Sequence, residues 1–209
     1  MVELLICNQM VAGSNPVLGS ILRTKMNPKF IIFTGPMFGS KTTRLFAALD
    51  RYKYQKRNII AFKPKIDDRY SEENITTHSG ASMPARMVES GTEVMHYMRH
   101  HDKYDVVAVD EAFMLKGISW ALIDLFKQGK TIVVSSLDLS ASGKDFEEVT
   151  AMFPWATHIE KCPAVCTVCG ADAFYTHKKV EHLAEITVGG AELYEPRCWS
   201  HIDFMKNSF

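Results

Sequence analysis

The sequence lacks any apolar run long enough to cross a membrane: its hydrophobic stretches extend over four to six residues, and a spanning helix needs about 20. It also lacks an excess of charge, because 24 Lys and Arg residues balance 24 Asp and Glu residues. This balance excludes a strongly basic nucleic-acid-binding protein and an acidic disordered tail. Internal repeats and low-complexity segments are absent as well. The 209-residue chain is therefore predicted to be a soluble globular protein with no membrane partner.

Cysteine is scarce and unevenly distributed. The chain has five cysteines, and four of them fall within the last 48 residues, beside a histidine. An odd total, with four cysteines clustered beside a histidine, favours a metal site in a reducing compartment over a disulfide framework. Because no targeting signal is recognisable, we expect a cytoplasmic protein.

The first 25 residues show neither a helical nor a strand pattern, whereas Met26 stands four residues before an apolar run. We therefore expect residues 1–25 to be a non-native or disordered extension, with Met26 as the true start. A genuine flexible extension is the alternative, and the intact mass of the native protein distinguishes the two.

From Phe30 onward, short apolar runs alternate with helical patterns. The runs without polar alternation, typical of strands buried on both faces, are Phe30–Phe33, Ile59–Phe62, Val106–Val109 and Ile132–Val134. Helical stripes lie between them, over 43–52, 94–98 and 118–126. This order predicts an α/β fold with a mostly parallel sheet and a ligand site at the carboxyl ends of its strands. The pattern changes after Lys161, so we expect a nucleotide-binding domain over 26–161 and a metal-binding domain over 162–209.

A phosphate-binding loop follows the first expected strand. Its residues are Gly35, Pro36, Met37, Phe38, Gly39, Ser40, Lys41 and Thr42. In the usual pattern G-x-x-x-x-G-K-[ST], backbone N–H groups and the following helix cradle the phosphates of a nucleotide. Here Gly39-Ser40 stands where Ser-Gly is expected, so a Cβ occupies the position where the backbone curls around phosphate. The alternative, a plain glycine turn that caps a helix, does not account for the Lys-Thr pair.

Two carboxylates follow the expected strand Val106–Val109. Asp110, at the end of a buried strand, is typical of a residue that holds magnesium, and Glu111 is a candidate acceptor for the proton of an attacking nucleophile. Asp-Glu after a strand is also a common helix start. The phosphate loop about 70 residues upstream favours the catalytic interpretation.

The carboxyl-terminal pattern predicts a metal site. Cys166-x-x-Cys169 and Cys198-x-x-His201 are separated by 28 residues, and two such turns suit a closed, structural tetrahedral zinc site. A redox Cys-x-x-Cys motif is the competing interpretation, and Cys162 is either a spare thiol or a rival ligand. From Cys162 onward the chain has four Lys and Arg residues and six Asp and Glu residues. This balance of charge argues against a nucleic-acid partner.

Together these motifs resemble the thymidine kinase family of the zinc-containing cellular and bacterial type. Further segments are similar to it: the stretch 63–70 with Asp67 and Arg69, the turn 77–80, Leu137-Asp138 with Phe146, and 188–194. The last segment resembles the lasso loop that closes over the base. The resemblance extends from about Phe30 to His201.

The resemblance implies a P-loop NTPase-like (RecA-like) α/β domain and a small zinc-ribbon or lasso domain. It implies transfer of the γ-phosphate of ATP to the 5′-hydroxyl of thymidine in nucleotide salvage, with deoxyuridine also allowed. Glu111 and Arg69 would be catalytic; Thr42, Asp110 and Asp67 would hold Mg²⁺; and structural Zn²⁺ would bind Cys166, Cys169, Cys198 and His201. The nucleoside would contact Met37, Met114, Leu137, Phe146, Thr187, Val188, Gly189 and Tyr194. Family members are commonly homotetramers.

Two other functions remain as alternatives. One is a P-loop ATPase that hydrolyses ATP without a nucleoside. The other is a non-catalytic nucleotide-binding module, which would follow if the order Gly39-Ser40 abolished transfer. Ala141, which stands where many members carry an aromatic residue, predicts a looser fit of thymidine or admission of a larger base.

Overall fold

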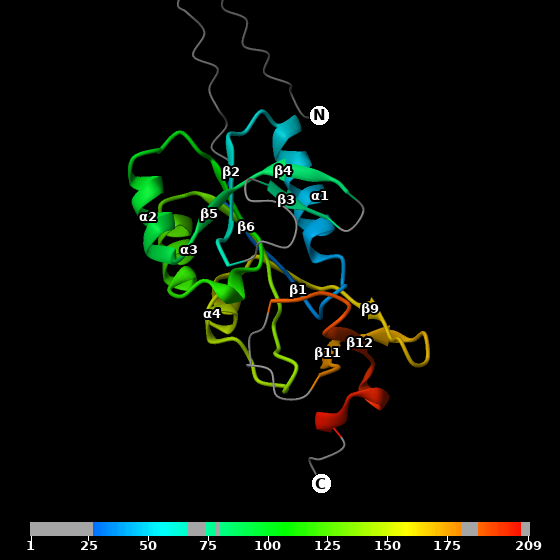
Figure 1. Ribbon diagram of the computed structural model, residues 1–209. Coiled ribbons are helices and arrows are strands. Elements are labelled where there is room, and N and C mark those ends of the chain that lie inside the picture. Colours follow the sequence, from blue (N-terminus) through cyan, green and yellow to red (C-terminus); the bar gives the residue numbers. More distant parts are fainter. Residues whose placement is uncertain (1–26, 67–73, 78–79, 181–187, 206–209) are drawn as a thin grey trace, which may run out of the picture.

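The computed structural model describes residues 27–66, 74–77, 80–180 and 188–205. Within this part of the chain a parallel sheet has the strand order β5-β2-β6-β7-β1-β8 (Figure 1). Its strands are β1 (Phe30–Thr34), β2 (Ile59–Pro64), β5 (Arg86–Val88), β6 (Val106–Val109), β7 (Thr131–Ser135) and β8 (His158–Lys161). Because every pairing is parallel, the carboxyl ends of all these strands lie at one edge of the sheet.

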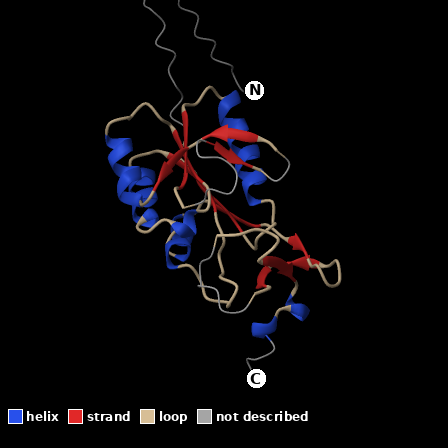
Figure 2. Ribbon diagram, viewed as in Figure 1, coloured by secondary structure: helices blue, strands red, loops and turns tan. Residues whose placement is uncertain are grey.

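Helices cover both faces of the sheet (Figure 2). They are α1 (Lys41–Tyr54), α2 (Gly91–Arg99), α3 (Ile118–Lys127) and α4 (Glu147–Thr150), with short 3₁₀ turns at Ala112–Met114, Phe153–Trp155, Trp199–His201 and Asp203–Met205. Leu45 and Leu49 of α1 pack with Ala108 on one face. Residues of α2 and α3 pack with Val107 and Val109 on the other.

This two-sided burial confirms the interpretation of the apolar runs. Successive residues of a strand point to opposite faces, so a strand with helices on both sides needs apolar residues at every position. All four expected strands and all three expected helices are present, which confirms the α/β class. The edge strand β8 is not among the expected strands, because its sequence His-Ile-Glu-Lys contains no apolar run. Its residues are largely exposed in the structure.

Small antiparallel pairs complete the described structure. The hairpin β3 (Asn74–Thr76) with β4 (Ser82–Pro84) lies beside α1 (Figure 1). Near the carboxyl end β9 (Ala164–Val165) pairs with β10 (Asp172–Ala173), and β11 (Tyr175–Lys178) pairs with β12 (Tyr194–Arg197). We call residues 162–180 and 188–205 the C-terminal module. Residues 1–25, the expected extension, lie outside the described residues. None of the described helices is long and apolar enough to span a membrane.

Candidate functional site

The phosphate loop joins β1 to α1 with a backbone that is left-handed at several positions. Gly35 has φ 127°, Phe38 has φ 65° and Ser40 has φ 57°. Non-glycine residues adopt positive φ uncommonly, and where they do so the surrounding structure over-determines the conformation, often at functional sites. The loop therefore has the defined, strained shape expected of a ligand-binding turn.

The unusual order Gly39-Ser40 has a physical reason in this loop. A Cβ added at Gly39 would lie 2.7 Å from the carbonyl oxygen of Cys162 and 3.1 Å from that of Pro36, so only glycine fits there without a shift of the backbone. Ser40 is exposed, and its Cβ is accommodated at the cost of the left-handed conformation. The loop thus has a glycine at a position where a Cβ would collide with the backbone.

Lys41 is the first residue of α1 and is buried, with 8% of its surface exposed. Its Nζ donates a hydrogen bond to the carbonyl oxygen of Pro36 at 2.6 Å. Burial lowers the pKa of Lys41, and the nearby carboxylates of Glu111 and Asp110 oppose that shift. The loop therefore folds around the amino group of its own lysine.

Asp110 and Glu111 follow β6, which is separated from β1 by the single strand β7 in the sheet. The hydroxyl of Thr42 lies 3.3 Å from both carboxylate oxygens of Asp110. From the neighbouring β7, the hydroxyl of Ser135 donates a short hydrogen bond to Asp110 Oδ1. Glu111 is half-buried in the left-handed conformation, with φ 50°. The parallel sheet thus brings together two motifs that are about 70 residues apart.

One cavity at this edge of the sheet contains most of the expected phosphate and magnesium residues. It is lined by Met37, Phe38, Gly39, Ser40, Lys41, Thr42, Thr43, Lys63, Asn74, Ile75, Thr76, Thr77, Asp110, Glu111 and Gly190. Gly35 and Pro36 shape the loop without lining the cavity. Lys63, 4% exposed at the end of β2, was missed; a lysine that closes an apolar strand is the signal that could have found it.

The hydrophobic residues expected around the nucleoside gather on the face of the sheet covered by α2 and α3. Leu137 belongs to the apolar cluster of this face, and Met37, Met114 and Phe146 pack against it. The rings of Phe113 and Phe146 lie 4.6 Å apart at an angle of 42°. These four residues therefore all contact the same apolar core, and Met37 also lines the cavity.

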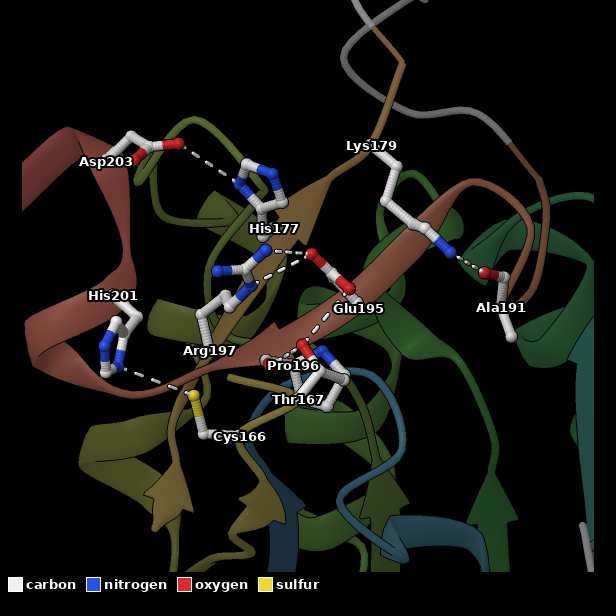
Figure 3. A network of polar contacts seen from close by, with 10 residues as sticks. All are labelled: Cys166, Thr167, His177, Lys179, Ala191, Glu195, Pro196, Arg197, His201 and Asp203. Carbon is white, nitrogen blue, oxygen red and sulfur yellow. Dashed lines mark hydrogen bonds and ion pairs between the residues drawn. The ribbon is translucent and has the colours of Figure 1, made fainter. Parts of the chain in front are cut away.

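The expected lasso loop emerges from the β11–β12 pair. Its two stems are tied together, because the backbone N–H of Lys179 donates to Leu193 and its Nζ donates to the carbonyl oxygen of Ala191 at 2.7 Å (Figure 3). Tyr194 is buried at the start of β12 and donates its backbone N–H to Gly190. Val188 and Gly189 are half-buried. Gly190 lines the cavity, so the loop reaches the phosphate-binding side.

The predicted metal ligands form a compact cluster. The ligand atoms of Cys166, Cys169, Cys198 and His201 all lie within 4.8 Å of one another. Cys198 Sγ lies 3.1 Å from His201 Nδ1, and Cys169 Sγ lies 3.6 Å from Cys198 Sγ. Tetrahedral zinc bonds of about 2.0–2.3 Å place such atoms roughly 3.5–3.8 Å apart, so the donor set fits zinc.

The lowered pKa of one ligand, Cys166, also suits a metal. Burial opposes ionisation of Cys166, but backbone N–H groups of Cys198 and Val168 hold the pKa of its thiol at about 6. A thiolate is the form of cysteine that binds metal. Among the described residues Cys162 is not part of the cluster. Its Sγ instead lies 3.7 Å from the carbonyl oxygen of Glu160, so it is not a rival ligand in this arrangement.

Three expected site residues, Asp67, Arg69 and Thr187, lie outside the described residues. Their expected roles stay predictions.

Known proteins match this chain over the segments described above. A family model described as thymidine kinase matches residues 29–202. A protein from Thermococcus kodakarensis named thymidine kinase is 35% identical over 180 residues, which cover 81% of this chain and 91% of that relative. The range 29–202 contains the phosphate loop, the two carboxylates and the metal cluster.

Proposed function

Because the chain belongs to the thymidine kinase family, we propose that it transfers the γ-phosphoryl group of ATP to the 5′-hydroxyl of thymidine. The observation that carries the proposal is the single cavity that joins the phosphate loop, Asp110, Glu111 and the lasso glycine Gly190. This arrangement supports the proposal, because the phosphates, the two carboxylates and the loop expected to close over the nucleoside would then surround one volume.

The phosphate loop would hold ATP. Backbone N–H groups of the loop and the amino terminus of α1 would bind the polyphosphate, and Lys41 would exchange its bond to Pro36 for the β- and γ-phosphates. Thr42 and Asp110, whose oxygens lie 3.3 Å apart, would hold Mg²⁺, with Asp67 ordering its waters. Bound Mg²⁺ would supply neutralisation of the phosphate charge.

Glu111 would be the general base. Its carboxylate accepts the proton of the 5′-hydroxyl while the hydroxyl oxygen bonds to the γ-phosphorus, and the bond between that phosphorus and the β,γ-bridging oxygen breaks to release ADP. Arg69 would stabilise the charge that spreads over the transferred group. Because little covalent chemistry is left to the protein, positioning of the two substrates supplies most of the acceleration.

The thymine base would lie against the apolar neighbourhood of Met37, Met114, Leu137 and Phe146. Backbone groups of the lasso around Thr187, Val188 and Gly189 would read its polar edge, and Tyr194 would support the loop. The four-residue metal cluster would hold Zn²⁺ with no position left for a substrate. We further propose a cytoplasmic homotetramer that acts in nucleotide salvage and also accepts deoxyuridine.

The test is steady-state phosphorylation by the full chain with magnesium and ATP. Acceptors are thymidine, deoxyuridine, deoxycytidine and deoxyadenosine, beside a blank without nucleoside. Glu111→Gln is the loss-of-base variant, and Glu147→Gln on the exposed start of α4 is its matched control. Removal of a general base lowers kcat by roughly 10²–10⁴-fold, so thymidine turnover collapses in Glu111→Gln and persists in Glu147→Gln.

Other outcomes favour the alternatives. Hydrolysis of ATP at the same rate in the blank indicates an ATPase. ATP binding without turnover of any nucleoside indicates a non-catalytic nucleotide-binding module.

A further inference from the structure

We propose that Thr176 and Phe38 are positioning residues that dock the phosphate loop onto the C-terminal module, so that the metal cluster controls the affinity for ATP. The metal cluster then acts on the nucleotide as well as on the lasso. This inference rests on the proposed function in taking ATP as the ligand of the loop.

The first contact is a hydrogen bond between segments far apart in the sequence. The backbone N–H of Met37 donates to Thr176 Oγ1 at 3.1 Å. Thr176 lies on β11 of the C-terminal module and is only 3% exposed. Within the phosphate loop this amide therefore points to the module, and loss of the hydroxyl would leave the N–H group without its acceptor.

The second contact is the side chain of Phe38. It packs against the apolar cluster formed by Ala164, Cys166, Ala173 and Cys198. Cys166 and Cys198 belong to the two different ligand pairs of the metal cluster. Part of the surface that receives Phe38 therefore comes from both ligand pairs, and this part depends on the pairs staying together. The left-handed backbone of Phe38, with φ 65°, is an unfavourable conformation that such packing can maintain.

The third contact is the close approach of the loop to the chain that enters the module. A Cβ at Gly35 would lie 2.4 Å, and one at Gly39 2.7 Å, from the carbonyl oxygen of Cys162. Cys162 is itself held by a hydrogen bond from its N–H to Thr34 at the end of β1. The loop thus touches the module, or the strand leading into it, on several sides.

These contacts have a thermodynamic consequence. If only the docked loop binds phosphate well, the apparent affinity for ATP scales with the fraction of molecules in which the loop is docked. Separation of the metal ligands disturbs the surface under Phe38, and removal of the Thr176 hydroxyl takes the acceptor from the part-buried N–H of Met37. Either change should weaken ATP binding.

The experiment measures ATP binding to the full chain directly, by titration calorimetry without nucleoside. Thr176→Val removes the hydroxyl and keeps the shape, Thr176→Ser retains the hydroxyl, and Thr167→Val is the matched control, because that hydroxyl bonds to Glu195 inside the module (Figure 3). Loss of one such part-buried hydrogen bond costs about 0.5–1.5 kcal/mol, which corresponds to a weakening of binding by up to about tenfold. We expect this increase in Kd for Thr176→Val and a near-normal Kd for the other two variants.

A second arm removes the metal with a chelator and follows zinc content and ATP affinity together. The wild type should lose more ATP affinity than Thr176→Val, in which the connection is already weakened. Phe38→Leu, which keeps part of the apolar contact, should lie between wild type and Thr176→Val. If circular dichroism shows that Thr176→Val does not fold, the Kd of Phe38→Leu for ATP tests the inference instead.

The outcomes separate this inference from the proposed function. Thr176→Val or Phe38→Leu that folds and binds ATP as tightly as Thr167→Val overturns the inference, whatever the thymidine activity. The predicted losses of ATP affinity in a chain that phosphorylates no nucleoside support the inference and overturn the proposed function. A wild-type chain that binds no ATP overturns both.

Discussion

The order of Gly39 and Ser40 in the phosphate loop leads to a prediction with opposite signs at two neighbouring positions. Gly39→Ala should destabilise the protein and weaken ATP binding, whereas Ser40→Gly should stabilise it slightly. The reason is that there is no space for a side chain at Gly39, whereas Ser40 has an unfavourable backbone conformation. At Gly39 the atoms nearest to a new Cβ are the carbonyl oxygens of Cys162 and Pro36, at 2.7 and 3.1 Å.

The magnitudes follow from these two causes. Neither carbonyl can move without a shift of the loop or of the chain after β8, and forcing an extra methyl into such a site costs about 1–3 kcal/mol. The left-handed backbone of Ser40, with φ 57°, costs about 1–2 kcal/mol relative to glycine. Glycine also makes the unfolded chain more flexible, which lowers the free energy of unfolding by roughly 0.5–1 kcal/mol and offsets part of this gain. Ser40→Gly should therefore gain about 0.5–1 kcal/mol.

The assay is urea unfolding of each variant, with calorimetric titration of ATP at the same temperature. Ser40→Ala is the control, because it removes the hydroxyl but keeps both the Cβ and the strained backbone, and it should match the wild type. A Gly39→Ala variant as stable as the wild type, or a Ser40→Gly variant less stable than Ser40→Ala, would refute this account of the loop.

Further predictions concern other polar contacts. Ser135→Ala removes the hydrogen bond that orients Asp110, so it should raise the magnesium concentration needed for half-maximal activity several-fold and leave the thymidine KM unchanged; an unaltered magnesium dependence would contradict this role. Glu148 accepts hydrogen bonds from Gly117 and Ser119 at the start of α3, so Glu148→Gln should cost about 1–2 kcal/mol, against almost no effect of Glu147→Gln. Although burial opposes it, these bonds lower the pKa of Glu148 from its ordinary 4.5, so the stabilisation is complete above pH 4.5 and is lost as the pH falls through the folded-state pKa. Unfolding measured between pH 7 and pH 3 should show the difference between wild type and Glu148→Gln shrink with acidification, and a constant difference would contradict the assignment.

Local patterns were sufficient to predict the central elements. The apolar runs at β1, β2, β6 and β7 are readable because strands covered on both faces need apolar residues throughout. The metal ligands are readable because each Cys-x-x-Cys or Cys-x-x-His turn supplies two ligands by itself. The resemblance to the thymidine kinase family, which rested on the order of such motifs, is confirmed by the comparisons.

Contacts between distant segments were not predictable in this way. The strand β8 carries no apolar run and is a strand because β1 offers it a partner. The bond from Met37 to Thr176 joins residues 139 positions apart, which no spacing rule addresses.

The sequence by itself determined which residue types are available and how the chain alternates between strand and helix, since both follow from periodicities of two and 3.6 residues. It did not determine why Gly39 precedes Ser40. Only the tertiary structure decided that, because the oxygen that excludes a side chain at Gly39 belongs to Cys162, more than a hundred residues away. Crowding depends on where the folded backbone places its atoms, and that is a property of the packed sheet and module together.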